Sequence, residues 1–145
     1  MPNMSEIWLH NAALLAYGLA TAAALWGVAR RDVGQRIALV ILTVALLLQT
    51  AAIALRWLRL EHGPYVDLFE ILASNVWSLH LSVWLACLAL PRSRSGLAMV
   101  LPVLLVLVIW LAVVPTQDNP APVTYATIWL AFHVWLGKVF LGCIV

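Results

Sequence analysis

Charged residues are scarce in this sequence. Only 10% of its 145 residues are Asp, Glu, Lys or Arg, whereas 65% are hydrophobic. A soluble domain averages about 25% charged residues, so this composition excludes a water-facing surface of the usual kind. The net charge of +2 is small, and the arginines are divided among short loops, which excludes a basic patch for nucleic acid. We therefore expect an integral membrane protein whose helices contact membrane lipid.

Cysteine is also scarce. The two cysteines, Cys87 and Cys143, lie in separate apolar runs without the spacing of metal ligands. Buried cysteines of this kind behave as small hydrophobic residues, so we expect no redox or metal chemistry from them. The first segment, MPNMSEIWLHN, lacks the basic residues that open a cleavable signal peptide. We expect the first apolar run to remain in the membrane as a true span.

Long apolar runs are what the sequence has in abundance. A helix needs about 20 apolar residues to cross about 30 Å of hydrocarbon, and helices satisfy their backbone polar groups internally. The alternating segments of a membrane β-barrel are not present. We predict an all-α polytopic helical bundle, a single domain over residues 1–145, with about five transmembrane helices near 7–29, 37–58, 68–90, 97–114 and 123–145.

The basic residues indicate the orientation of these spans. The loops RRDVGQR and PRSRSG carry five arginines: Arg30, Arg31, Arg36, Arg92 and Arg94. The opposite ends of the spans carry most of the acidic residues, together with two arginines: Glu6, Glu61, Asp67, Glu70, Asp118, Arg56 and Arg59. Short cytoplasmic loops are enriched in Lys and Arg, so we predict an N-terminus outside, with residues 56–70 and the loop PTQDNPAP at the outer face.

The segment ALRWLRLEHGPYVDLFEILASNVWS is too polar for a span and too apolar for a free loop. After a turn at Gly63 and Pro64, apolar residues at helical spacing over 67–77 predict an amphipathic start to the third span. Two interpretations remain open. The segment is either an interfacial elbow, with Arg56 and Trp57 at the level of the lipid headgroups, or a shaped floor for a ligand.

The last span contains TIWLAFHVWLGKVF, which includes two ionisable residues. Trp129, His133 and Gly137 are spaced by four, so they share one helical face. A neutral imidazole is a common axial ligand of haem iron. A tryptophan one turn above can stack on a macrocycle, and a glycine one turn below leaves room for it. The alternative is a buried histidine hydrogen-bonded to a neighbouring helix, and spacing does not separate the two interpretations.

Two further ionisable residues lie within predicted spans. His80, near the middle of the third span, is a candidate second haem ligand, proton-relay member or interhelical hydrogen-bond partner. Lys138 follows His133 by five residues, a rotation of about 140° on a 3.6-residue helix. We therefore expect Lys138 to face away from the histidine and to lie near a carboxylate, a carbonyl or a lipid headgroup.

Motifs in two stretches resemble those of a known family. In LLLQTAAIALRWLRLEHGPYVDLFEILASNVWS an Arg-Trp pair precedes a His-Gly-Pro turn, an aromatic-Glu pair and a tryptophan, and in YATIWLAFHVWLGKVF a Trp-Leu pair precedes His-Val. Over about residues 40–145 the chain thus resembles the N-terminal part of the CcsA-type (ResC-type) cytochrome c assembly proteins. The residues that carry the first motif are Arg56-Trp57, His62-Gly63-Pro64, Asp67-Leu68-Phe69-Glu70 and Trp77.

The resemblance implies a cofactor and partners. In that family the histidine corresponding to His133 is the first of two external axial ligands of a haem that is presented to apocytochrome c. A non-covalent b-type haem is thus implied, with these candidate binding residues: His133 as the iron ligand, Trp129, Gly137, His62, Glu70 and His80. Also implied are a second membrane subunit (CcsB/ResB-like, or the remainder of a split CcsA-type protein) and the bacterial cytoplasmic (inner) membrane or an equivalent energy-transducing membrane.

The chain also departs from the family. It lacks the family's Trp-Gly-x-x-Trp-x-Trp-Asp segment and second external histidine, Gln49 stands where many members have histidine, and Asp67 replaces asparagine. Because Val145 falls inside the last predicted span, we expect part of a longer or split protein, or a reduced relative without haem delivery.

Three functional hypotheses follow from these residues. The first is a haem-handling subunit of cytochrome c assembly, in which a second chain or segment supplies the opposing ligand. The second is a membrane anchor or b-type haem subunit of an electron-transfer complex, and the third a cofactor-free structural subunit. No residue has the setting of a nucleophile or general base, so the chain alone is not expected to be an enzyme, and at most forms part of a haem-attachment complex.

Overall fold

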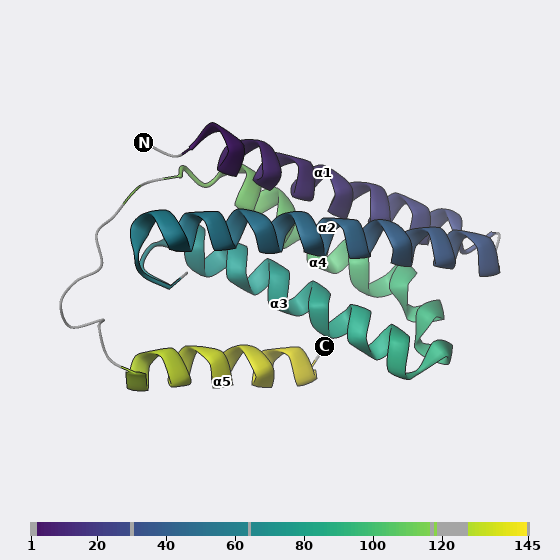
Figure 1. The fold of residues 1–145 in the computed structure, drawn as a ribbon. Coiled ribbons are helices and arrows are strands. Elements are labelled where there is room, and N and C mark those ends of the chain that lie inside the picture. The colour runs from purple at the N-terminus through teal and green to yellow at the C-terminus, as the bar shows by residue number, and fades with distance from the viewer. Residues whose placement is uncertain (1–2, 30, 64, 117, 119–127, 145) are drawn as a thin grey trace.

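The computed structural model describes residues 3–29, 31–63, 65–116, 118 and 128–144. The described residues form helices and no strand, and the predicted all-α polytopic bundle is confirmed. The elements are α1 (Met4–Trp26), α2 (Arg31–Leu60), α3 (Leu68–Ala89), the 3-10 helix η1 (Pro91–Gly96), α4 (Leu97–Val113) and α5 (Ile128–Ile144). In Figure 1, α1 to α4 run antiparallel in one bundle, and α5 lies outside it beside α3.

Within the described part of the chain, four stretches of helix are long and apolar enough to cross a membrane: Met4–Trp26, Val33–Leu60, Leu68–Ala89 and Pro91–Val113. They correspond to the first four predicted spans. The fifth predicted span is represented by α5, which has 17 described residues, while residues 123–127 and Val145 lie outside the described part. With 30 residues, α2 is about 45 Å long. It therefore exceeds the about 30 Å of hydrocarbon, and its last turns reach the interface.

The first two helices are in extensive contact, and both carry a series of buried alanines. These are Ala13, Ala16, Ala20 and Ala24 of α1 and Ala38, Ala45 and Ala52 of α2. At the turn between the helices, a Cβ atom on Gly34 would collide with the backbone of Gly27. Small residues let helix backbones approach in a membrane. The α1–α2 hairpin is therefore a close-packed part of the bundle.

Local signals explain where α3 begins. The Asp67 carboxylate accepts a 2.7 Å hydrogen bond from the backbone N–H of Glu70 and caps the helix. Before it, Glu61 has a φ of 58°, and the N–H of Tyr65 donates to the carbonyl of Gly63 at 2.9 Å. The predicted turn is thus present at Gly63, whereas Pro64 lies outside the described residues. The predicted amphipathic start over 67–77 is the first half of α3.

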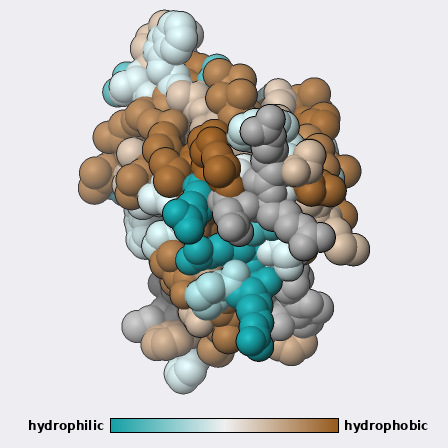
Figure 2. All heavy atoms as spheres, turned by 90° about the vertical axis from the view of Figure 1, so that its right-hand side faces the viewer, coloured by the Kyte–Doolittle hydropathy of each residue, from teal (hydrophilic) through white to brown (hydrophobic). Residues whose placement is uncertain are grey.

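The two ends of the bundle differ in chemistry. Figure 2 views the end formed by the α1–α2 and α3–α4 connections and shows a hydrophilic patch between hydrophobic flanks. The described arginines at this end are Arg31, Arg36, Arg92 and Arg94, while Arg30 lies outside the described residues. At the other end, Figure 1 brings together the start of α1, the end of α2, the start of α3 and the end of α4. This second end was predicted to be the outer face, and it carries the candidate sites.

Candidate functional site

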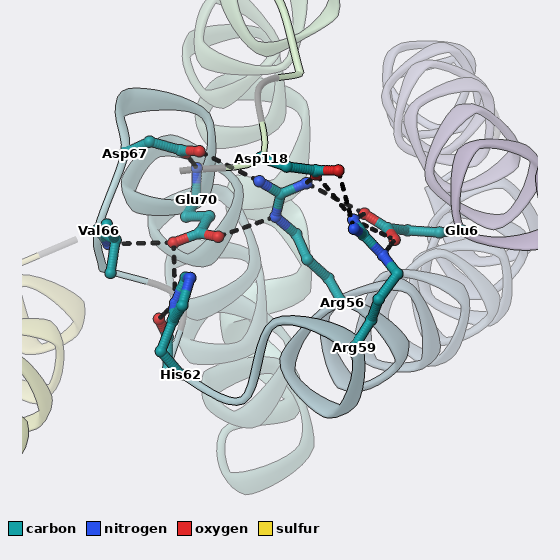
Figure 3. Close-up of polar contacts among 9 residues, drawn as sticks. Glu6, Arg56, Arg59, His62, Val66, Asp67, Glu70 and Asp118 are labelled. Carbon is teal, nitrogen blue, oxygen red and sulfur yellow. Dashed lines mark hydrogen bonds and ion pairs between the residues drawn. The ribbon is translucent and has the colours of Figure 1, made fainter. Parts of the chain in front are cut away.

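A buried network of charges around Arg56 joins three helices at the predicted outer end (Figure 3). The Arg56 guanidinium donates from Nε to Glu70 at 2.9 Å, from Nη1 to Glu6 at 3.1 Å and from Nη2 to Asp67 at 3.1 Å. Only 5% of Arg56 is exposed. A planar guanidinium presents its donors in a fixed fork, so one side chain of α2 sets the positions of α1 and α3.

The predicted headgroup anchor is therefore corrected for Arg56. Its charge is compensated by carboxylates inside the bundle. The neighbouring Trp57 is 46% exposed.

Arg59, one turn further along α2, extends the network to the segment after α4. Its guanidinium donates to both carboxylate oxygens of Asp118 at 2.9 Å and to Glu6 at 3.0 Å. These hydrogen bonds hold the pKa of the Asp118 carboxyl well below its usual range. The segment that follows α4 is thus fastened to α2 by a bidentate ion pair.

His62 and Glu70, two predicted haem-site residues, belong to this network. The carboxylate of Glu70 accepts hydrogen bonds from Arg56 and from the backbone N–H of Val66, at 2.9 and 3.0 Å. His62 Nδ1 lies 3.7 Å from the same carboxylate and 3.0 Å from the carbonyl of Gly63. Both side chains are therefore held by groups of the elbow and of α2.

A cavity of about 100 Å³ lies beneath the network, and Glu6, His10 and Gln49 contribute to its lining. Gln49 is fully buried, and neither its Oε1 nor its Nε2 has a hydrogen-bond partner with good geometry among the described residues. The sequence interpretation used Glu6 only for the orientation and did not name Glu6 or His10 as site residues. The spacing of these two residues in the sequence does indicate a site. Polar residues spaced by four inside an apolar span share a helical face and mark a functional or structural polar contact.

His80 lies in the packed core. Its Nδ1 is 2.7 Å from the carbonyl of Val76 in the same helix, and its ring centroid is 4.1 Å from that of Tyr17 on α1. Since the carbonyl accepts, Nδ1 carries the hydrogen. The polar contact is thus made within α3, and the contact to another helix is a ring contact.

His133 lies on an exposed face of α5. It borders a shallow depression of about 290 Å³, whose other lining residues come from α3, α5 and the elbow: Tyr65, Ile71, Asn75, Val134, Gly137 and Lys138. Trp129 is 80% exposed, and a Cβ built on Gly137 meets nothing within 4 Å. Of the two interpretations that the spacing left open, a histidine buried against a neighbouring helix does not agree with the exposed position of His133.

Lys138 borders the same depression. Its ammonium donates to Ser74 Oγ at 2.6 Å and to Asn75 Oδ1 at 2.9 Å, both on α3. Lys138 therefore points towards α3, and His133 and Lys138 border the same depression from different positions around α5. The amide oxygen of Asn75 is a carbonyl oxygen of the kind that was expected near it.

The predicted site residues thus fall into three places: His133, Trp129 and Gly137 on α5, His62 and Glu70 at the charged end, and His80 in the core. Among the described residues, no three His, Cys, Asp or Glu side chains lie together as a metal site. The α5 face does fit one side of a haem, since it offers a free imidazole beside an open glycine. Comparison of the chain with protein-family models, curated proteins and solved structures gave no match. The functional conclusion therefore depends on the residues of this chain.

Proposed function

We propose that this protein is a haem-handling membrane subunit of cytochrome c assembly that holds haem at the outer face for attachment to apocytochrome c. The observation that carries the proposal is the exposed imidazole of His133 at the edge of an open depression. The motifs around His133 and around Arg56-Trp57 that resemble the CcsA-type proteins support it.

In this function the imidazole of His133 would bind the haem iron. Gly137 leaves space beside the imidazole, and Trp129 offers an exposed indole on the same face of α5. Bound haem supplies the vinyl groups to which the cysteine thiols of apocytochrome c add. The charged network around Arg56 fixes α1, α2 and α3 relative to one another at the predicted outer end. The face of α5 that carries His133 is therefore presented on a fixed part of the bundle.

The second axial ligand comes from a partner in this proposal. His62 is held at the charged end and His80 in the core, and neither lines the depression that His133 borders. A second membrane subunit, CcsB/ResB-like or the remainder of a split CcsA-type protein, supplies the opposing histidine and covers the exposed face of α5.

The proposal is tested by the absorption spectrum of the protein purified with its partners. We expect a Soret band that His133→Ala reduces about tenfold or more, because losing an axial ligand removes the main directional bond to the iron. His62→Ala is the matched control and is expected to keep the band, since its imidazole lies apart from α5. Undiminished haem content in the His133 variant contradicts the proposal.

A strain that lacks the gene for this protein tests the proposed role in cytochrome c assembly. We expect loss of haem covalently attached to c-type cytochromes, with b-type cytochromes intact. Loss of one respiratory activity alongside normal cytochrome c would instead identify an anchor or b-type subunit of an electron-transfer complex.

A further inference from the structure

The ammonium of Lys138 is incompletely compensated. It has three donors, and two are used on neutral oxygens, Ser74 Oγ and Asn75 Oδ1. No described carboxylate forms an ion pair with it. A charge within a membrane bundle is costly unless an opposite charge lies close, and neutral acceptors do not supply one. The contacts of Lys138 therefore leave room for an anion.

Two depressions meet at this lysine. The first is the depression that His133 borders. The second, of about 190 Å³, is lined mainly by apolar and aromatic side chains, including Trp57 and Trp77, and shares Tyr65, Val134 and Lys138 with the first. The indole N–H of Trp77 donates to Thr50 at 2.8 Å, so its ring offers an apolar surface with the polar atom already satisfied. The ammonium of Lys138 thus lies at the edge of this second depression, which we call the apolar slot.

The surroundings of Lys138 limit the kind of anion that fits. Lys138 lies ten residues after Ile128 and six residues before Ile144, which is about 15 Å and about 9 Å along α5. A phospholipid headgroup would bring a large hydrated group into the apolar slot. A carboxylate carried directly on an apolar body reaches the lysine without bringing a headgroup into the bundle.

From these contacts we propose that Lys138 binds the carboxylate of an acidic amphiphile whose apolar body lies in the slot against Trp57 and Trp77. A fatty acid and a porphyrin propionate both have this chemistry. The binding needs neither iron nor His133, so the proposal goes beyond haem ligation and stands or falls separately from it.

The test uses iron-free probes, each with an uncharged ester, and the purified protein in a neutral detergent. Protoporphyrin IX is compared with its dimethyl ester by porphyrin fluorescence, and 9,10-dibromostearic acid with its methyl ester by tryptophan quenching. We expect the free acid to bind at least about tenfold more tightly than the ester, because a buried charge pair is removed in the ester. Lys138→Met is expected to abolish this preference.

Matched variants isolate the charge. Lys138→Arg keeps the cation and Ser74→Ala removes only a neutral acceptor, so both are expected to keep the preference for the acid. His133→Ala is also expected to keep it, which distinguishes this site from the haem ligand. A preference shown by one probe alone identifies that amphiphile as the ligand class. The proposal is overturned if neither acid is preferred by the unmodified protein, or if the preference survives in Lys138→Met.

Discussion

At the scale of single residues, Arg56 has the largest structural role at the predicted outer end. It donates hydrogen bonds to three carboxylates, from α1, from the start of α3 and from its cap, and it lies 3.6 Å from a fourth, that of Asp118. Nearly all of Arg56 is buried. Arg59 has a similar set of partners, but 25% of its side chain is exposed. Exposed ion pairs are screened by solvent. We therefore expect the removal of Arg59 to destabilise the protein less than the removal of Arg56.

Replacing Arg56 is therefore expected to be severe. Arg56→Ala leaves Glu70 buried without its arginine partner and leaves Glu6 paired with Arg59 alone, and breaking a buried pair in this way costs about 3–5 kcal/mol. The free energy of unfolding in detergent, measured by titration with a denaturing detergent, checks it. Arg36→Ala, at an exposed position, is the control, and equal stability of the two variants would show that the network contributes nothing.

The ion pair of Asp118 predicts a pH dependence. Its pKa is lowered by Arg59 from an ordinary value of 3.8. The stabilisation is therefore complete above that value and is lost as the pH falls below it towards the folded-state pKa. We expect Asp118→Asn to be less stable than the unmodified protein at about pH 7 and the difference to shrink below about pH 4. Thermal unfolding of both proteins over this range measures it, and a difference that is constant with pH argues against the ion pair.

At the scale of elements, the α1–α2 hairpin and α5 represent opposite extremes. The hairpin is close-packed through alanines and through Gly27 and Gly34. In contrast, α5 has most of its large apolar side chains exposed and contacts α3 on one side. The length of the apolar runs predicted all three helices, but it does not state which helices touch. The side-chain sizes on the contacting faces decide that.

The glycine contact gives a test of this packing. Gly34→Ala places a methyl group against the backbone of Gly27, where no flexible side chain can move aside. Overpacking of this kind costs about 1–3 kcal/mol. Gly18→Ala is the matched control, because its Cβ would meet nothing within 4 Å. The unfolding midpoints of the two variants are compared, and a Gly34 variant as stable as the Gly18 variant would exclude a close approach of the helices.

At the scale of the whole molecule, the distribution of charge predicts how the bundle sits in the membrane. Arg31, Arg36, Arg92 and Arg94 lie at the end that holds the α1–α2 and α3–α4 connections, and the other end carries Arg56 and Arg59. Short cytoplasmic loops are enriched in Lys and Arg, so the end with Arg56 and Arg59 is predicted to lie outside.

Labelling of single cysteines in intact cells checks this orientation. In a background without Cys87 and Cys143, Glu61→Cys is expected to react with a membrane-impermeant maleimide from outside, since Glu61 is exposed. Arg92→Cys, also exposed, is expected to react only after the membrane is permeabilised. The reverse labelling pattern would mean that the orientation is inverted and that the α5 depression lies on the cytoplasmic side.

The sequence by itself determined the class of the protein, the approximate spans and the shared face of Trp129, His133 and Gly137. These properties follow from local composition and from the 3.6-residue period, which neighbouring residues decide. Only the tertiary structure decided that Arg56 pairs with Glu6, 50 residues away, and that Lys138 shares a depression with His133. The reason is physical: long, flexible charged side chains take the partner that packing brings within reach, and the other half of each contact comes from a different helix.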